Sequence, residues 1–284
     1  MRFVRAFESF PAPAEWSGRI AEHLAGRLEP VPSRLAATVV LLRDTARGPE
    51  AYLVKRSATM AFAGGRYAFP GGRVDPQDGA ALPAGAWVGP SPAQWAERFD
   101  CSEADAVALV SAAVRETFEE TGVLLAGPDA SSLVSSTASD DWEADRLATE
   151  AHEISLADLL TKRGLLLRTD LLGAWSRWVT PEFEPRRYDT AFFVAVLPEG
   201  QSAREVSGET EGMLWARPEQ ALADHAAGRV LMLPPTVATL REVGAHADAA
   251  TVLTAAASRT LAPIEASVEQ APDGTYALVW PLDR

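Results

Sequence analysis

The chain has 284 residues, of which 47% are hydrophobic and 23% charged, as in an ordinary globular protein with a sizeable core. Its 26 Lys and Arg residues and 39 Asp and Glu residues give a formal net charge of −13, which excludes binding to the nucleic-acid backbone through overall charge. The single cysteine, Cys101, excludes an internal disulfide, and no apolar stretch approaches the ~20 residues of a membrane helix. We therefore expect a cytoplasmic protein with no nucleic-acid or membrane partner.

The first part of the chain predicts a β-hairpin followed by irregular backbone. Residues 35–43 and 51–55 are short β-forming runs on either side of a polar, turn-like stretch. Paired glycines and a proline in residues 61–75 predict irregular backbone around one short strand. Residues 76–101 are rich in Pro, Gly and Ala, and we expect an inserted loop there with one helical turn.

A long helix is predicted after this insert. Ser102 suits an N-cap, apolar residues recur at helical spacing behind it, and Gly122 suits a left-handed C-terminal end. The recurring apolar residues are Val107, Val110, Val114 and Phe118.

The second half of the chain predicts intermixed helices and strands. They are helix 142–163, strand 190–197, strand 213–217, helix 218–227, one or two helices in 235–259 and a hairpin in 267–280. Because helices and strands are intermixed without strict alternation, we predict an α+β fold with a mixed β-sheet sandwiched between helices.

The stretch RETFEETG at residues 115–122 raises the question of function. On a helix, Glu116, Glu119 and Glu120 share an arc of about 100°, opposite the apolar side. Such a run is either a solvated helix face or a pocket in which a divalent cation relieves the repulsion between carboxylates. Arg115 stands four residues before Glu119 and can orient that carboxylate.

This stretch resembles the second half of the Nudix hydrolase signature, G-x5-E-x7-R-E-U-x-E-E-x-G-U, in which U is a bulky aliphatic residue. Gly72, at the end of FPGG, matches the leading glycine, and Thr117 replaces the first aliphatic residue. Gly72 and Arg115 are 115 − 72 = 43 positions apart, many more than in the signature, so a long segment is inserted. The resemblance implies a Nudix fold and favours the metal pocket. The counterpart of the signature's first glutamate is open among Asp75, Asp78 and Glu103.

The wider pattern resembles one subgroup of the family. A long insert within the signature, together with three later motifs, resembles the long-insert Nudix group that includes the peroxisomal coenzyme A diphosphatases of animals. The motifs lie at residues 178–181, 186–198 and 231–236. The implied divisions are an N-terminal extension at 1–34, a Nudix domain at 35–245 with its insert at about 76–101, and a C-terminal helix and hairpin packed on the same domain at 246–284.

The resemblance also implies a set of site residues. Members of the family hydrolyse a nucleoside diphosphate linked to another group, with metal ions that offset the diphosphate charge and activate water. Arg115 and Glu119 are then catalytic residues, and the general base is a glutamate of the signature or an acid on a later loop, for which Glu209 and Glu211 are the candidates. The implied ligands of Mg²⁺ or Mn²⁺ are Glu116, Glu119 and Glu120. The candidates for substrate binding are Arg56, Gly71, Gly72, Arg186 and Arg187.

Three functions are compatible with these residues. The subgroup favours coenzyme A or acyl-coenzyme A as substrate, cleaved to 3′,5′-ADP and (acyl-)4′-phosphopantetheine. Arg56, Ser57 and Gly65 fit the coenzyme A signature that precedes FPGG, whereas Ala61 stands where that signature has an arginine. A pyrophosphatase for ADP-ribose, NADH or another dinucleotide is therefore the first alternative. A non-catalytic module that binds a nucleotide and regulates a partner is the second.

Two further expectations concern the insert and the assembly. Trp87 and Trp95 lie in the insert and could line a substrate pocket. Because Nudix enzymes are often dimers, a homodimer that binds a small nucleotide is expected.

Overall fold

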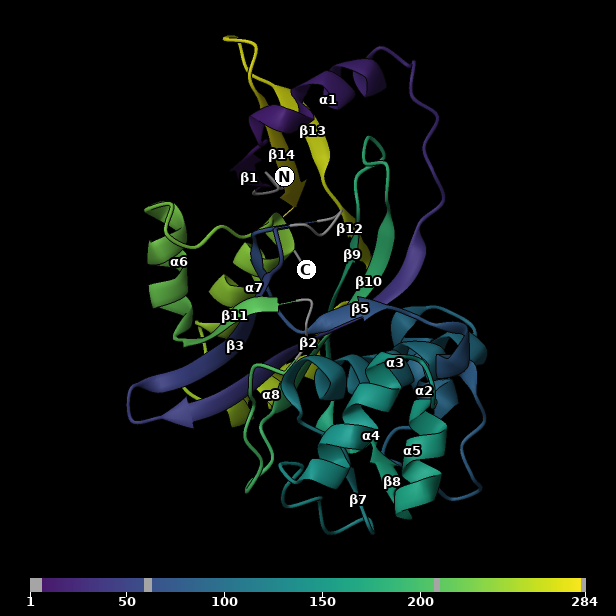
Figure 1. The fold of residues 1–284 in the computed structure, drawn as a ribbon. Helices are drawn as coiled ribbons and strands as arrows, with labels where there is room; N and C mark the ends of the chain where they lie inside the picture. Colours follow the sequence, from purple (N-terminus) through teal and green to yellow (C-terminus); the bar gives the residue numbers. More distant parts are fainter. Residues whose placement is uncertain (1–6, 59–62, 207–209, 282–284) are drawn as a thin grey trace.

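The computed structural model describes residues 7–58, 63–206 and 210–281, and its strands form one large mixed sheet and two small ones (Figure 1). The strands are β1 (Phe7–Pro11), β2 (Arg34–Thr45), β3 (Gly48–Arg56), β4 (Tyr67–Ala68), β5 (Gly71–Arg73), β6 (Trp87–Val88), β7 (Ala126–Gly127), β8 (Leu166–Arg168), β9 (Gly173–Val179), β10 (Tyr188–Val196), β11 (Thr210–Ala216), β12 (Pro263–Glu265), β13 (Ser267–Gln270) and β14 (Tyr276–Pro281).

The helices lie around this large sheet. They are α1 (Ser17–Leu24), α2 (Pro92–Phe99), α3 (Glu103–Thr121), α4 (Asp140–Glu150), α5 (Leu156–Arg163), α6 (Pro218–Ala226), α7 (Pro234–Val243) and α8 (Ala249–Ala256). Three short 3₁₀ turns accompany them in the described residues: η1 (Ala14–Trp16), η2 (Pro76–Gly79) and η3 (Thr169–Leu171).

Strand β2 lies inside the large sheet, whose order is β11-β3-β2-β10-β9-β12. It pairs in parallel with β10 and antiparallel with β3, and β5 pairs antiparallel with its residues 36–38. The β2–β3 pair is the predicted hairpin. The sheet is mixed and carries helices on both faces, so the predicted α+β fold is confirmed.

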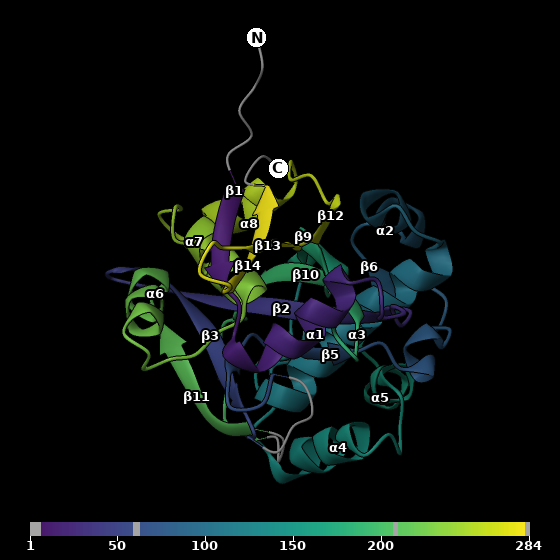
Figure 2. The same cartoon turned by 90° about the horizontal axis from the view of Figure 1, so that it is seen from above.

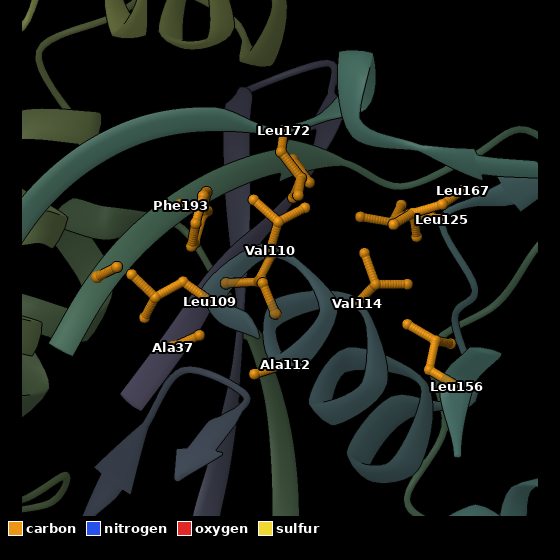
Figure 3. Packing of buried hydrophobic residues seen from close by; sticks show 14 of the residues in the cluster. Ala37, Leu109, Val110, Ala112, Val114, Leu125, Leu156, Leu167, Leu172 and Phe193 are labelled. Carbon is orange, nitrogen blue, oxygen red and sulfur yellow. The ribbon is translucent and has the colours of Figure 1, made fainter. Parts of the chain in front are cut away.

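The two faces of the sheet bury different helices because successive side chains of a strand point to opposite sides. Ala37 and Val39 of β2 belong to a core cluster with α3, whereas Val40 belongs to a second cluster with α7 and α8. Figure 3 shows Val110 and Val114 of α3 in the first cluster, between side chains of the sheet and of the segments that follow α3. Helix α3 is therefore fixed against one face of β2.

The ends of α3 follow the sequence prediction. The Ser102 side chain accepts a hydrogen bond from the backbone N–H of Asp105, which caps the first turn. Gly122 has φ 73°, the left-handed conformation that glycine adopts without strain, and ends the helix. The signature residues thus lie in the last two turns of a well-bounded helix.

The sequence predicts a loop with one helical turn for the insert, and the structure differs from this prediction. The insert contains η2 and the eight-residue helix α2, which begins with a capping box between Ser91 and Gln94. Trp95 and Phe99 of α2 are buried in the same core cluster as α3. The capping box was present in the sequence, but the Pro- and Gly-rich composition around it concealed the helix.

The helix predicted for residues 142–163 is two helices. The chain leaves α4 after Glu150 and begins α5 at a second capping box, formed by Ser155 and Asp158. The predicted helical region 235–259 is likewise divided into α7 and α8. The predicted strands at 190–197 and 213–217 correspond to β10 and β11.

The two ends of the described chain meet in one small sheet. Strand β1 pairs antiparallel with β14, and β14 pairs with β13 to complete the predicted C-terminal hairpin. The purple and yellow segments therefore lie together in Figure 1, and α1 projects over the large sheet when it is seen from above (Figure 2). Within the described ranges, no helix has the length and apolar character needed to span a membrane.

Candidate active site

Arg115 is the centre of a buried charged cluster at the end of α3. Its Nε and Nη2 donate to the two carboxylate oxygens of Asp78, over 2.7 Å and 2.9 Å. Its Nη1 lies 2.9 Å from Oε1 of Glu116 and 3.0 Å from Oε2 of Glu119. Nη2 also donates to the carbonyl oxygen of Arg73, over 3.0 Å. One guanidinium therefore ties α3 to η2 and to the glycine strand β5.

Asp78 occupies the place of the signature's first glutamate. It is the sixth residue after Gly72, as the spacing G-x5-E requires, and it makes a bidentate ion pair with Arg115. Asp75 instead caps η2, and Glu103 lies in the exposed first turn of α3. Counting from Gly72 would have selected Asp78 from the sequence alone.

The two glycines of β5 allow close approach to the carboxylates of α3. The backbone N–H of Gly71 donates to Oε2 of Glu120 over 2.9 Å. A Cβ atom on Gly72 would lie 2.4 Å from Oε1 of Glu116, and a Cβ atom on Gly71 would lie 2.4 Å from the carbonyl oxygen of Ala37. A side chain at residue 71 would therefore push β5 away from β2, and a side chain at residue 72 would displace the carboxylate of Glu116.

The carboxylates of the signature are not a solvated helix face. Glu119 is 6% exposed and Glu120 is 7% exposed. Burial raises the pKa of the Glu119 carboxyl to about 8, against the lowering effect of the Arg115 charge. Burial disfavours the charged Arg115, but its hydrogen bonds to Asp78 and the charge of Glu116 hold the pKa of Arg115 above its ordinary value.

The donor set at this end of α3 fits a hard divalent cation. Oε1 of Glu119 is buried and finds no hydrogen-bond partner among the described residues. A buried carboxylate oxygen left without a partner is costly, and a cation would remove that cost. No three acidic, His or Cys side chains in the described ranges form a ready-made metal cage. Mg²⁺ does not require one, because it is usually held by one or two carboxylates together with water and substrate phosphates.

Arg146 of α4 anchors the backbone at the end of α3. It is 1% exposed and is held by Glu143 over 2.7 Å and Glu150 over 2.9 Å. Its guanidinium donates to the carbonyl oxygen of Glu119 over 2.8 Å and to that of Val206 over 3.0 Å. The spacing E-x-x-R-x-x-x-E could have revealed the local ion pairs, but not the contacts with α3 and residue 206.

A cavity of about 240 Å³ lies beside the glycine strand, on the sheet face opposite α3. Strands β2, β10 and β9 contribute its floor, through Thr38, Phe192 and Trp178 among others. Gly71 and Gly72 belong to its lining, so β5 borders the cavity on one side and the carboxylates of Glu116 and Glu120 on the other.

Of the three arginines predicted to bind substrate, one lines the cavity and two do not. Arg56 lines it, and its buried Nε has no hydrogen-bond partner in the described part of the chain. Arg186 is exposed, and the described residues that line the cavity include neither it nor Arg187. Arg187 pairs with Glu265 over 2.6 Å and donates to the carbonyl oxygen of Thr180 over 2.9 Å, so it ties strands together and is not available to a phosphate.

Of the two acids predicted as candidates for the general base on a later loop, the structure describes only Glu211. Glu209 lies outside the described residues. Glu211 accepts hydrogen bonds from the backbone N–H of Ala58 over 3.0 Å and from the hydroxyl of Ser57 over 2.9 Å. These bonds lower the pKa of Glu211, which makes it a weaker base.

The tryptophans of the insert do not meet the expectation that they line the pocket. Trp95 is buried against Phe99 and Phe193 in the core, and the indole N–H of Trp87 donates to the carbonyl oxygen of Pro90 over 2.6 Å. Neither belongs to the described lining of the cavity. The insert supports α3 from the side, and the aromatic wall of the cavity comes from other segments.

The chain is similar to known proteins of one family. Residues 90–243 match the family model described as NUDT19 Nudix domain. The acyl-coenzyme A diphosphatase NUDT19 of Xenopus laevis is 26% identical over 224 residues, which are 66% of this chain and 57% of that protein. The Homo sapiens protein of the same name is 27% identical over 278 residues, covering 79% of this chain and 72% of the relative.

A solved structure shows the same fold. The Nudix hydrolase from Alicyclobacillus acidocaldarius has a TM-score of 0.65 and 29% sequence identity, and the match covers 79% of this chain and 96% of that one. The chain spans less than two thirds of the length of some of its curated relatives, 57% for the Xenopus laevis protein and 58% for the Gallus gallus protein of the same name.

Proposed function

We propose that this chain, which belongs to the family of the NUDT19 Nudix domain, hydrolyses the diphosphate of coenzyme A or an acyl-coenzyme A. Water adds to one phosphorus, the bridging P–O bond breaks, and the products are 3′,5′-ADP and 4′-phosphopantetheine or its acyl form. The reaction consumes one water and needs no oxidant or second substrate.

The observation that carries the proposal is the buried, unpartnered Oε1 of Glu119, whose other oxygen is held by Arg115. Glu116, Glu119 and Glu120 are the residues that would hold Mg²⁺ or Mn²⁺. A bound cation would offset the charge of the diphosphate and lower the pKa of water. Arg115 fixes two of these carboxylates through its Nη1, and Asp78 fixes Arg115 in turn.

The position of Arg56 supports a phosphorylated substrate in the cavity. Its Nε is buried without a partner in the described chain, and a guanidinium binds phosphate oxygens through directed N–H groups. Gly71 and Gly72 let the backbone of β5 lie close to the carboxylates of α3, so a substrate bound against β5 would lie near them. Between the two later acids, Glu209 remains the stronger candidate for a base, because hydrogen bonds already lower the pKa of Glu211.

The choice of coenzyme A rests on the names of the relatives and on the shape of the site. Three of the relatives are named acyl-coenzyme A diphosphatases. The cavity joins a cationic side at Arg56 to an apolar interior, as a substrate with a diphosphate and an apolar arm requires.

The test is a panel of coenzyme A, octanoyl-coenzyme A, ADP-ribose and NADH, incubated with Mg²⁺ or Mn²⁺ and resolved by chromatography. We expect 3′,5′-ADP from both coenzyme A substrates and no turnover in EDTA. A higher kcat/KM for ADP-ribose or NADH would replace the proposal with a dinucleotide pyrophosphatase. Binding of a nucleotide without turnover of any substrate would indicate a regulatory module.

A further inference from the structure

The wall of the cavity is completed by both ends of the described chain. Trp16, from the segment before α1, belongs to the lining, and so do Ala266 and Leu278 from the C-terminal hairpin region. These residues lie outside the matched Nudix segment 90–243. The pairing of β1 with β14 holds the two ends together, so the wall is one structure and not two independent tails.

Specific contacts attach the N-terminal part of this wall to the rest of the site. Glu15 pairs with Arg66, whose Nη2 lies 3.0 Å from its Oε1. The ring of Trp16 packs 5.6 Å from that of Phe183, in the loop between β9 and β10. The Nε of Arg19 donates to the carbonyl oxygen of Phe183 over 2.7 Å. Residues 15–19 therefore bridge Arg66, just before β4, and the loop between β9 and β10.

The charged and the apolar residues of the cavity lie toward opposite edges of the large sheet. Arg56, Arg66 and Arg73 belong to β3, to the residue before β4 and to β5, on one side of the sheet. Trp178 of β9 and Ala266 after β12 lie on the other side, two or more strands away. A substrate with its diphosphate at β5 would extend its remaining part across β2 and β10 toward these apolar residues.

The apolar side is unsuited to a phosphorylated nucleoside. Among the described lining residues, those of β9, β10 and the C-terminal hairpin region include no cation, and the acid Glu184 is close enough to Arg19 and Arg66 to interact with their charges. Trp178, Phe192 and Leu278 offer apolar surface, which a phosphate could reach only by losing its water. The volume of about 240 Å³ is below the 300–1,000 Å³ of sites for whole drug-sized ligands, so it holds one part of a substrate.

We propose that the apolar side of this cavity binds the uncharged pantetheine arm with its acyl group, and that Trp16 is a specificity-determining residue supplied by the N-terminal segment. This inference rests on the proposed function, because among the candidate substrates only coenzyme A and its acyl forms carry such an arm. The terminal segments then select the substrate, while α3 performs the reaction.

The first readout is kcat/KM for octanoyl-coenzyme A, coenzyme A and ADP-ribose, in the wild type and in Trp16→Ala. Removing the indole should lower kcat/KM about tenfold for octanoyl-coenzyme A, through KM, and leave ADP-ribose unchanged. Leu24→Ala is the matched control, because Leu24 lies on α1 but is 53% exposed and outside the described cavity lining. Trp16→Phe should restore most of the preference, which a general loss of folding would not allow.

The second readout separates this inference from the proposed reaction. Octanoyl-pantetheine, a probe without phosphate, is titrated into metal-free protein by calorimetry. We expect it to bind the wild type and to bind Trp16→Ala about tenfold more weakly. Failure of the wild type to bind this probe would overturn the inference even if coenzyme A is hydrolysed. An equal loss of kcat/KM for ADP-ribose and octanoyl-coenzyme A in Trp16→Ala would overturn it too, since it would place the shared adenosine in the cavity. If the wild type hydrolyses nothing but binds the probe, the proposed function fails and the arm site stands.

Discussion

The end of α3 and the cavity on the other face of the sheet are built in opposite ways. At the end of α3, an arginine and its acidic partners are buried within a short stretch of chain and η2. In the cavity, apolar side chains come from segments as distant as Trp16 and Leu278. Fixed charges can bind a metal and stabilise charge that develops in a reaction, whereas apolar walls can only select what enters. The comparison assigns chemistry to one region and selection to the other.

The largest effect is expected when a carboxylate of α3 loses its charge. Glu119→Gln and Glu120→Gln should each lower kcat by more than about 100-fold, because even the groups that orient metal ligands contribute 10–100-fold. Glu103→Gln is the control, since Glu103 is an exposed carboxylate in the first turn of the same helix. Steady-state kinetics with saturating Mg²⁺ measure the change. Near-normal turnover in both variants would mean that these carboxylates do not take part.

The next effect concerns the ion pair that holds Arg115. Asp78→Ala leaves a buried guanidinium without its bidentate partner and should lower the free energy of unfolding by about 3–5 kcal/mol. Turnover should fall about 10–100-fold, because the carboxylates of Glu116 and Glu119 lose their alignment. Urea unfolding and kinetics on the same samples test both parts. If Asp78→Ala has the same free energy of unfolding as the wild type, the bidentate pair of Asp78 with Arg115 does not anchor the site.

Arg56 and Arg187 differ in their expected roles: Arg56 binds the substrate, and Arg187 stabilises the fold. Arg56→Ala should raise KM about tenfold, because a charge-assisted hydrogen bond contributes about 1.5–3 kcal/mol. Arg187→Ala should leave KM unchanged and lower Tm, because its partners are Glu265 and a backbone carbonyl. A higher KM in Arg187→Ala than in Arg56→Ala would reverse the assignment of the two arginines.

The smallest effect on activity is expected at Arg146. Arg146→Met should lower kcat several-fold, up to about tenfold, because the carbonyl of Glu119 loses its anchor. Arg177→Met is a matched control: Arg177 also joins a carboxylate, that of Asp189, to a backbone carbonyl, that of Phe99. Both variants should lower Tm, but only the first should lower kcat. An equal decrease of kcat in both would make Arg146 a general stabilising residue.

Local features of the site could be predicted from the sequence. The caps at Ser102 and Gly122, the helix between them and the pair of Arg115 with Glu119 all follow from spacing over a few residues. The candidates for the first glutamate included Asp78, which the structure pairs with Arg115 across 37 positions.

Features that depend on distant contacts could not be predicted. Arg187 looked like a phosphate ligand beside an apolar strand, but Glu265 neutralises it from 78 positions away. The composition of the insert indicated a loop. The structure instead contains a helix there, because Trp95 and Phe99 bury their rings against Phe193 of β10, far along the chain. The wall around Trp16 depends on the pairing of β1 with β14, and neither strand shows that partner in its own sequence.

The central claim is that the carboxylates at the end of α3 hold a divalent cation. Binding of Mn²⁺ to the protein without substrate, measured by electron paramagnetic resonance, tests it most directly. The wild type and Glu103→Gln should bind Mn²⁺ equally, and Glu119→Gln should bind it at least about tenfold more weakly. Equal binding of Mn²⁺ by all three proteins would contradict the claim.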